Sequence, residues 1–171
     1  MRFLYLPLLF ALALLLQSAG IPMIFPQWVT QGVDLPLVIV VHIALTRGKS
    51  SGMVSGLILG YLQDALSGGV LGFNGMAMVV AGFTGGLLRE KFFVRSTAHR
   101  SISIAGAVLA FLLVKISTLV LFAQPYPPLL SAEFLWALTG NTAAALFIHI
   151  LLDRFETSFG IRPEEEIRLG D

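Results

Sequence analysis

The sequence predicts an all-α, polytopic membrane protein: a bundle of six transmembrane helices with both ends of the chain in the cytoplasm. Hydrophobic residues make up 56% of the 171 residues and charged residues only 12%, about half of the ~25% usual in soluble domains. A soluble domain of this length needs a charged surface, whereas lipid tolerates long uncharged runs. The absence of cysteine excludes disulfides and thiolate metal sites.

Six apolar stretches follow one another along the chain. A helix of about 20 residues spans the ~30 Å hydrocarbon core of a bilayer, and the second stretch is too short on its own. We therefore expect that span to begin near Gln27, with Pro36 as a kink or a first-turn residue. Gln17 stands where a signal-peptide cleavage site needs a small residue, so the first span is expected to stay uncleaved. The stretches cover residues 3–19, 35–46, 52–66, 70–88, 102–123 and 132–152.

Helix starts are indicated by side chains with an oxygen that precede the apolar runs. Such side chains cap the free N–H groups of a first helical turn. The expected caps are Asp34, Ser50 or Ser51, Ser101 and Ser131.

The placement of lysine and arginine gives the orientation. Cytoplasmic loops of membrane proteins carry an excess of these residues, and in a six-span arrangement every basic residue except Lys115 falls on one side. A re-entrant second stretch would move Arg47 and Lys49 to the other face, so the pattern favours a full span there. We expect a transmembrane domain over residues 1–153 and a short cytoplasmic tail over residues 154–171.

The third stretch carries a stripe of small residues that ends in a carboxylate. Gly52, Gly56 and Gly60 recur every four residues, and Asp64 continues the series. In lipid such stripes let two helices approach closely. They indicate packing within this bundle or, alternatively, a docking face for another membrane protein.

Three polar side chains are expected inside the membrane. Asp64 and Lys115 each lie about fourteen residues from the start of their spans, and unpaired charges at such depth are costly. We expect the two to pair in the bundle interior or, equally, Lys115 to reach the far interface while Asp64 meets water. Asn141 lies mid-span and is expected to hydrogen-bond across the bundle. His42 and His149 are interpreted as interface residues rather than ligands.

Signatures of common enzymes are absent: the sequence has no HExxH, no G-x-S-x-G and no phosphate loop. No pattern indicates a cofactor, a metal site or a nucleic-acid partner. We therefore expect a protein without catalytic residues.

The chain between Asp34 and Phe93 resembles the rod-shape-determining protein MreD family. That family shows a G-x-x-x-G-L-x-x-D-x-x-S-G pattern followed by L-G and a small polar residue. Tyr61 replaces the commoner leucine, and Gln63 is more polar than usual. The matching positions are Gly56, Gly60, Asp64, Ser67, Gly68, Gly72 and Asn74.

The resemblance implies a non-enzymatic component of the elongation machinery in the bacterial inner membrane. The partner that it implies is MreC, and through MreC the glycosyltransferase RodA, its transpeptidase and MreB filaments. Such a scaffold would help organise peptidoglycan synthesis and rod shape. The alternative is a substrate-binding subunit of a vitamin-type transporter, since intramembrane charge and helices interrupted by glycine or proline also suit a solute site.

Overall fold

The computed structural model describes residues 2–24, 26, 32–68, 70–92, 97–129 and 131–158, and this part of the chain is helical with short connections and no strand. The all-α class expected from the sequence is therefore confirmed. The first helix, α1 (Arg2–Leu15), continues through the π-helical turn η1 (Leu16–Gly20) into α2 (Ile21–Ile24). The later helices are α4 (Leu35–Arg47), α5 (Lys49–Ser67), α6 (Phe73–Phe92), α7 (Thr97–Leu121) and α8 (Ala132–Ser158).

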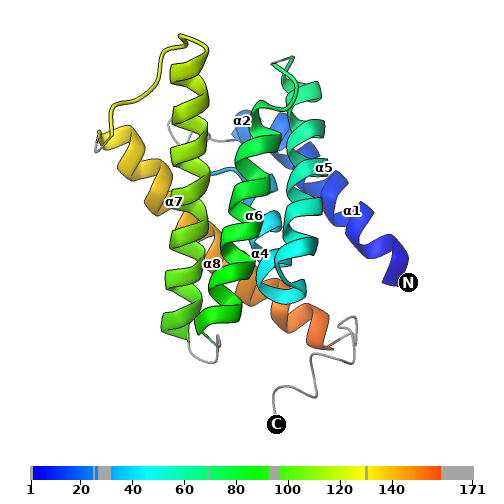
Figure 1. The fold of residues 1–171 in the computed structure, drawn as a ribbon. Coiled ribbons are helices and arrows are strands. Elements are labelled where there is room, and N and C mark those ends of the chain that lie inside the picture. The colour runs from blue at the N-terminus through cyan, green and yellow to red at the C-terminus, as the bar shows by residue number, and fades with distance from the viewer. Residues whose placement is uncertain are drawn as a thin grey trace.

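Helix α4 forms the centre of the bundle. Every residue from Pro36 to Thr46 is buried, because α4 packs against α1, α5, α6, α7 and α8. Figure 1 shows α5, α6 and α7 side by side in front of α4, and α8 crossing behind them. A helix buried on all sides needs no polar face, which accounts for its continuous run of apolar residues.

The second apolar stretch begins later than the sequence led us to expect. Helix α4 starts at Leu35, not near Gln27, which lies outside the described residues. The carboxylate of Asp34 accepts a hydrogen bond of 3.2 Å from the Leu37 N–H, and Pro36 occupies the first turn. Both features define a helix start at this point, so α4 stays at 13 residues.

The other expected caps divide into one that forms and three that do not. The Ser131 hydroxyl accepts from the Phe134 N–H at 3.2 Å and caps α8. Helix α5 instead begins at Lys49 after Gly48, whose φ of 88° turns the chain directly out of α4. Helix α7 begins at Thr97. Ser50, Ser51 and Ser101 therefore lie inside helices, because the polar flanks of these apolar runs are helical too.

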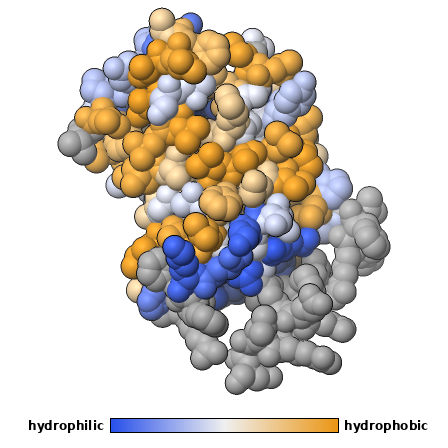
Figure 2. Space-filling view, in the orientation of Figure 1, coloured by the Kyte–Doolittle hydropathy of each residue, from blue (hydrophilic) through white to orange (hydrophobic). Residues whose placement is uncertain are grey.

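The surface has one hydrophilic end and a broad apolar region. Figure 2 shows the hydrophilic residues gathered at the lower end of the molecule, where α4 and α6 end and α5 and α7 begin (Figure 1). We call this the basic end, and it carries Arg47, Lys49, Arg89, Lys91 and Arg100. Above it, large apolar side chains are exposed, which is unusual for a surface that faces water. They include Leu57, Leu113, Val120 and Phe147.

Two helices in the described part of the chain are long and apolar enough to cross a membrane by length and composition. They cover Ala98–Leu121 and Ala132–Ser158, and shorter apolar helices cover Tyr5–Gly20 and Leu35–Arg47. Helices α5 and α6 have 19 and 20 residues, so they are long enough but contain more glycine and polar residues.

The glycines of α5 lie directly against the backbone of α6. A Cβ atom added to Gly52 would lie 2.8 Å from the Gly82 carbonyl oxygen, and one added to Gly56 would lie 2.5 Å from the Met78 oxygen. At Gly60 the added atom would lie 2.5 Å from the Gly75 Cα. Real Cβ atoms essentially never approach so closely, so glycine is required at these three positions.

We expect Gly56→Ala to destabilise the fold, because the new methyl group meets rigid backbone. Overpacking of this kind costs about 1–3 kcal/mol. The matched control is Gly75→Ala in the same contact, where an added Cβ lies 3.7 Å from its nearest neighbour. That change should be neutral or stabilising, since alanine favours a helix by about 1 kcal/mol over glycine. Thermal unfolding of the detergent-solubilised variants measures both, and equal melting temperatures would contradict the close contact.

Candidate functional site

Three buried polar clusters hold the bundle together, and they contain most of the residues singled out in the sequence. The first joins α5 to α6 through Asp64. The second surrounds the start of α4 at Asp34, and the third surrounds its end at His42.

Asp64 binds the first turn of α6. Its carboxylate accepts hydrogen bonds from the Asn74 N–H at 3.1 and 3.2 Å, from the Asn74 side-chain amide at 2.8 Å and from the Gly75 N–H at 3.4 Å. The side chain is 1% exposed. A helix N-terminus has unpaired N–H groups and a partial positive charge, so it stabilises a carboxylate. Asp64 therefore fixes the end of α5 to the start of α6.

The residues that follow Asp64 form the turn between the two helices. The Ser67 hydroxyl donates to the Asp64 carbonyl at 3.1 Å. Gly68 ends α5 with a φ of 65°, and Gly72 precedes α6 with a φ of 90°. Side chains rarely adopt these left-handed conformations, so the Asp-x-x-Ser-Gly motif and the later glycine encode one tight connection.

The structure does not bring Asp64 and Lys115 together. Asp64 faces the bundle interior and is satisfied by the α6 N-terminus, so the pairing with Lys115 and the contact with water that we expected as alternatives are both absent. The Lys115 ammonium lies 5.3 Å from the centre of the Phe111 ring. A cation over an aromatic face is attracted to the ring, and Lys115 also lines a cavity beside Glu133 and Trp136.

Asn141 connects α8 to the segment that leads into α4. Its side-chain oxygen accepts from the Asp34 N–H at 2.7 Å, and its amide donates to the Gly32 carbonyl at 2.9 Å. Asp34 also accepts from the Gln63 amide at 3.2 Å, and Gln17 accepts from the Leu35 N–H at 3.0 Å. Helices α5, α8 and η1 thus fix the start of α4.

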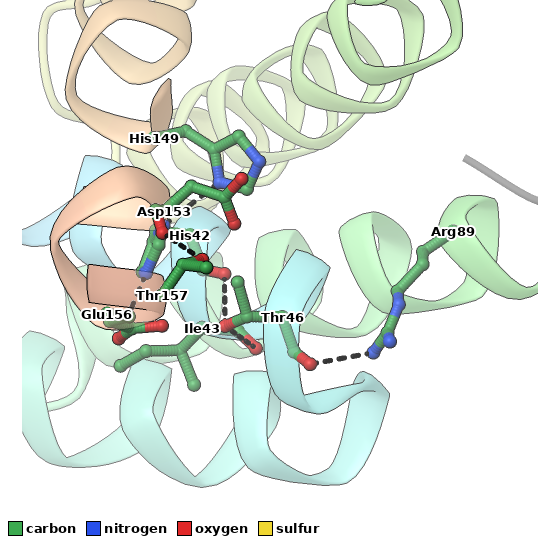
Figure 3. Close-up of polar contacts among 8 residues, drawn as sticks. All are labelled: His42, Ile43, Thr46, Arg89, His149, Asp153, Glu156 and Thr157. Carbon is green, nitrogen blue, oxygen red and sulfur yellow. Dashed lines mark hydrogen bonds and ion pairs between the residues drawn. The ribbon is translucent and has the colours of Figure 1, made fainter. Parts of the chain in front are cut away.

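Two histidines and a glutamate form the third cluster, at the basic end (Figure 3). Nδ1 of His42 lies 2.9 Å from Nδ1 of His149, and Nε2 of His42 lies 3.4 Å from the Glu156 carboxylate. All three residues are at most 3% exposed. A ring nitrogen that carries a proton donates and one that carries none accepts. The His42 ring, with one nitrogen toward each partner, therefore connects His149 to Glu156.

Around this cluster, further polar contacts join α4 to α6 and α7 to α8. The Thr46 hydroxyl donates to the His42 carbonyl at 2.9 Å, and Arg89 donates to the Thr46 carbonyl at 3.0 Å (Figure 3). Arg100 of α7 pairs with Asp153 of α8 at 3.4 Å. Among the described residues, no group of three or more His, Asp or Glu side chains is placed to hold a metal ion.

Charge at the basic end sets the ionisation of Glu156. Burial raises the pKa of this carboxyl group, but the hydrogen bond and charge of His42 and the charge of Arg47 outweigh burial and lower the pKa below its usual 4.5. Glu156 is therefore ionised at neutral pH, although it is almost fully buried.

The sequence interpretation missed part of these clusters. It interpreted each histidine as an interface residue, whereas the two rings contact each other from positions 107 residues apart. Both histidines stand five residues before an arginine, Arg47 or Arg154. That shared spacing led us to interpret both as residues of the cytoplasmic interface, and it also indicates that they lie at one depth. Glu156 was assigned to the tail and was not considered.

A family model described as rod shape-determining protein MreD matches residues 1–155. The chain belongs to the MreD family. No curated protein and no solved structure matches the chain. Membership in the MreD family assigns the protein a role in determining rod shape and in the rod-shape complex, and it identifies a membrane-associated shape protein of a family not known for enzymes.

We expect Asp64 and Lys115 to contribute to stability independently. Asp64→Ala removes the acceptor for the α6 N-terminus and should cost about 2 kcal/mol, whereas Lys115→Met should change stability little. Asp64→Asn keeps one acceptor oxygen, so its stability should lie between that of the wild type and that of Asp64→Ala. A double-mutant cycle from thermal unfolding should give a coupling within about 0.5 kcal/mol of zero. A coupling well above that would mean that the two charges do pair.

The His42 cluster makes stability depend on pH through Glu156. Folding lowers the pKa of Glu156 below its ordinary value of 4.5. The contribution of this carboxylate to folding stability is therefore fully present above about pH 4.5, and it is lost as the pH falls through the lowered pKa. Glu156→Gln should therefore lower the melting temperature at pH 7, by a loss of about 1.5–3 kcal/mol, and flatten the decline on acidification. Glu133→Gln at the exposed start of α8 is the matched control and should leave both unchanged.

Proposed function

We propose that this MreD-family protein is a six-span protein of the bacterial inner membrane that acts as a non-enzymatic scaffold for cell elongation. Both ends of the chain lie in the cytoplasm in this proposal. The scaffold binds MreC and, through it, helps organise RodA, its transpeptidase and MreB during peptidoglycan synthesis. The observation that carries the proposal is the family match over residues 1–155.

The surface of the bundle supports a membrane location. Large apolar side chains cover the region beyond the basic end, and that end gathers the basic residues that face the cytoplasm in membrane proteins. In the described part of the chain, six helical segments succeed one another: α1 with η1 and α2, then α4 to α8. An even number of crossings returns the C-terminus to the side of the N-terminus.

The use of the buried polar groups supports a scaffold over the transport-subunit alternative. A solute site needs polar groups that face a cavity, whereas Asp34, Asp64, Asn141 and His42 bond to neighbouring helices. A groove between α1 and α5 is lined mainly by apolar side chains. These polar groups fix helix positions, and a rigid bundle is suited to holding a partner.

Two measurements test the proposal. Affinity purification of the detergent-solubilised protein should recover a single-span MreC protein in near-stoichiometric amount, and depletion should turn rod-shaped cells round. Lys115→Met should restore rods as fully as the wild type, whereas Gly56→Leu should not. Recovery of an ATPase module without MreC, or rods that persist after depletion, would overturn the scaffold.

A further inference from the structure

We propose that the groove between α1 and α5 is a binding site for one anionic phospholipid of the cytoplasmic leaflet. The groove has a volume of about 1210 Å³, above the ~300–1,000 Å³ of most small-molecule sites. The inference rests on the membrane orientation given under the proposed function. It adds a ligand and a residue that selects its charge.

The walls of the groove suit an alkyl chain. Helix α1 contributes Leu6, Phe10 and Leu14, and α5 contributes Val54, Ile58 and Leu62. The α5 lining extends from Ser50 to Leu62, and these twelve steps of about 1.5 Å correspond to about 18 Å along the helix. One leaflet contributes half of the ~30 Å hydrocarbon core, so the groove matches the length of one acyl chain.

The polar groups of the groove lie at one end of it, apart from Ser55, whose hydroxyl donates to the Gly52 carbonyl. Arg47 is the last residue of α4, and Ser50 and Ser51 lie in the first turn of α5. This is the basic end, where the headgroups of the cytoplasmic leaflet would lie in the proposed orientation. An acyl chain in the groove therefore places its phosphate beside Arg47.

Arg47 has donors to spare for such a phosphate. Its charge acts on Glu156, yet its guanidinium makes no hydrogen bond or ion pair of its own with another described residue, unlike Arg89 and Arg100. The Ser50 and Ser51 hydroxyls likewise have no hydrogen-bond partner in the described part of the chain. A guanidinium donates two parallel hydrogen bonds to a phosphate, and its charge favours an anionic lipid over a zwitterionic one.

Native mass spectrometry with equimolar phosphatidylglycerol and phosphatidylethanolamine tests the selectivity. We expect the wild type to retain the anionic lipid preferentially, and Arg47→Gln to lose about fivefold of that preference, the effect of one basic residue near a headgroup. Arg154→Gln removes the same charge from an exposed position at the same end and should keep the preference. No preference in the wild type, or an equal loss in both variants, would overturn the site.

Filling the groove tests its position. Ala11→Phe should reduce retention of both lipids, because Ala11 lines the groove, whereas Ala143→Phe on the exposed face of α8 should not. If both changes reduce retention equally, lipid is bound elsewhere.

Photo-cross-linking in membranes uses the otherwise unchanged chain and so does not depend on how the Arg47 variant folds. A photoreactive residue at position 54 should yield a phospholipid adduct, whereas a protein adduct at this position, from MreC or a second copy, would overturn the inference. A protein that supports rods and binds MreC but shows no lipid selectivity would refute only this inference. A protein absent from the membrane fraction would refute the proposed function as well.

Discussion

The close approach of α5 and α6 is the constraint on which the rest of the bundle depends. Gly52, Gly56 and Gly60 lie against the α6 backbone, and Gly82 and Gly86 of α6 lie equally close to Gly52 and Lys49. In lipid, apolar side chains gain nothing by leaving their solvent, so helix association depends on close packing and hydrogen bonds. Two glycine stripes that face each other supply the packing along the whole interface, and Asp64 closes its far end with hydrogen bonds to the start of α6.

The central helix is held differently, by polar side chains at its two ends. Helix α8 supplies groups to both: Asn141 where α4 begins, and His149 with Glu156 where it ends. A short helix with a fully apolar middle has no other means of fixing its position along its own axis, because its apolar contacts are non-directional. Hydrogen bonds are directional, and a buried group left without its partner costs about 1–3 kcal/mol. Helix α8 thus fixes both ends of α4, together with Gln17 and Gln63 at its start and Arg89 at its end.

The sequence predicted what depends on local pattern and missed what depends on pairs distant in the chain. The sequence predicted the helix locations, the cap at Asp34 and the small-residue stripe of α5, because each of these patterns is formed by residues close together in the chain. The second stripe, at Gly82 and Gly86, has the same spacing of four and could have been found. The acceptor role of Asp64 could not, because a carboxylate deep in a span favours a charged partner on general grounds, and Lys115 was the obvious one. Only the fold shows that the α6 N-terminus lies closer. The pairing of His42 with His149 required the relative positions of α4 and α8, which no periodicity specifies.

Residues that pack inside the bundle are not available to a partner protein. Gly52, Gly56 and Gly60 are already covered by α6, so they can affect partner binding only through the shape of the bundle. A partner must use the exposed apolar faces, among them those of α7 and α8, where Leu113 and Phe147 point outward. Such faces contact lipid chains and helices equally well, so they provide little specificity by themselves. Specificity must then come from the outline of a rigid bundle. The buried hydrogen bonds and the glycine contacts produce that rigidity, so a family motif without catalytic chemistry can still be essential to function.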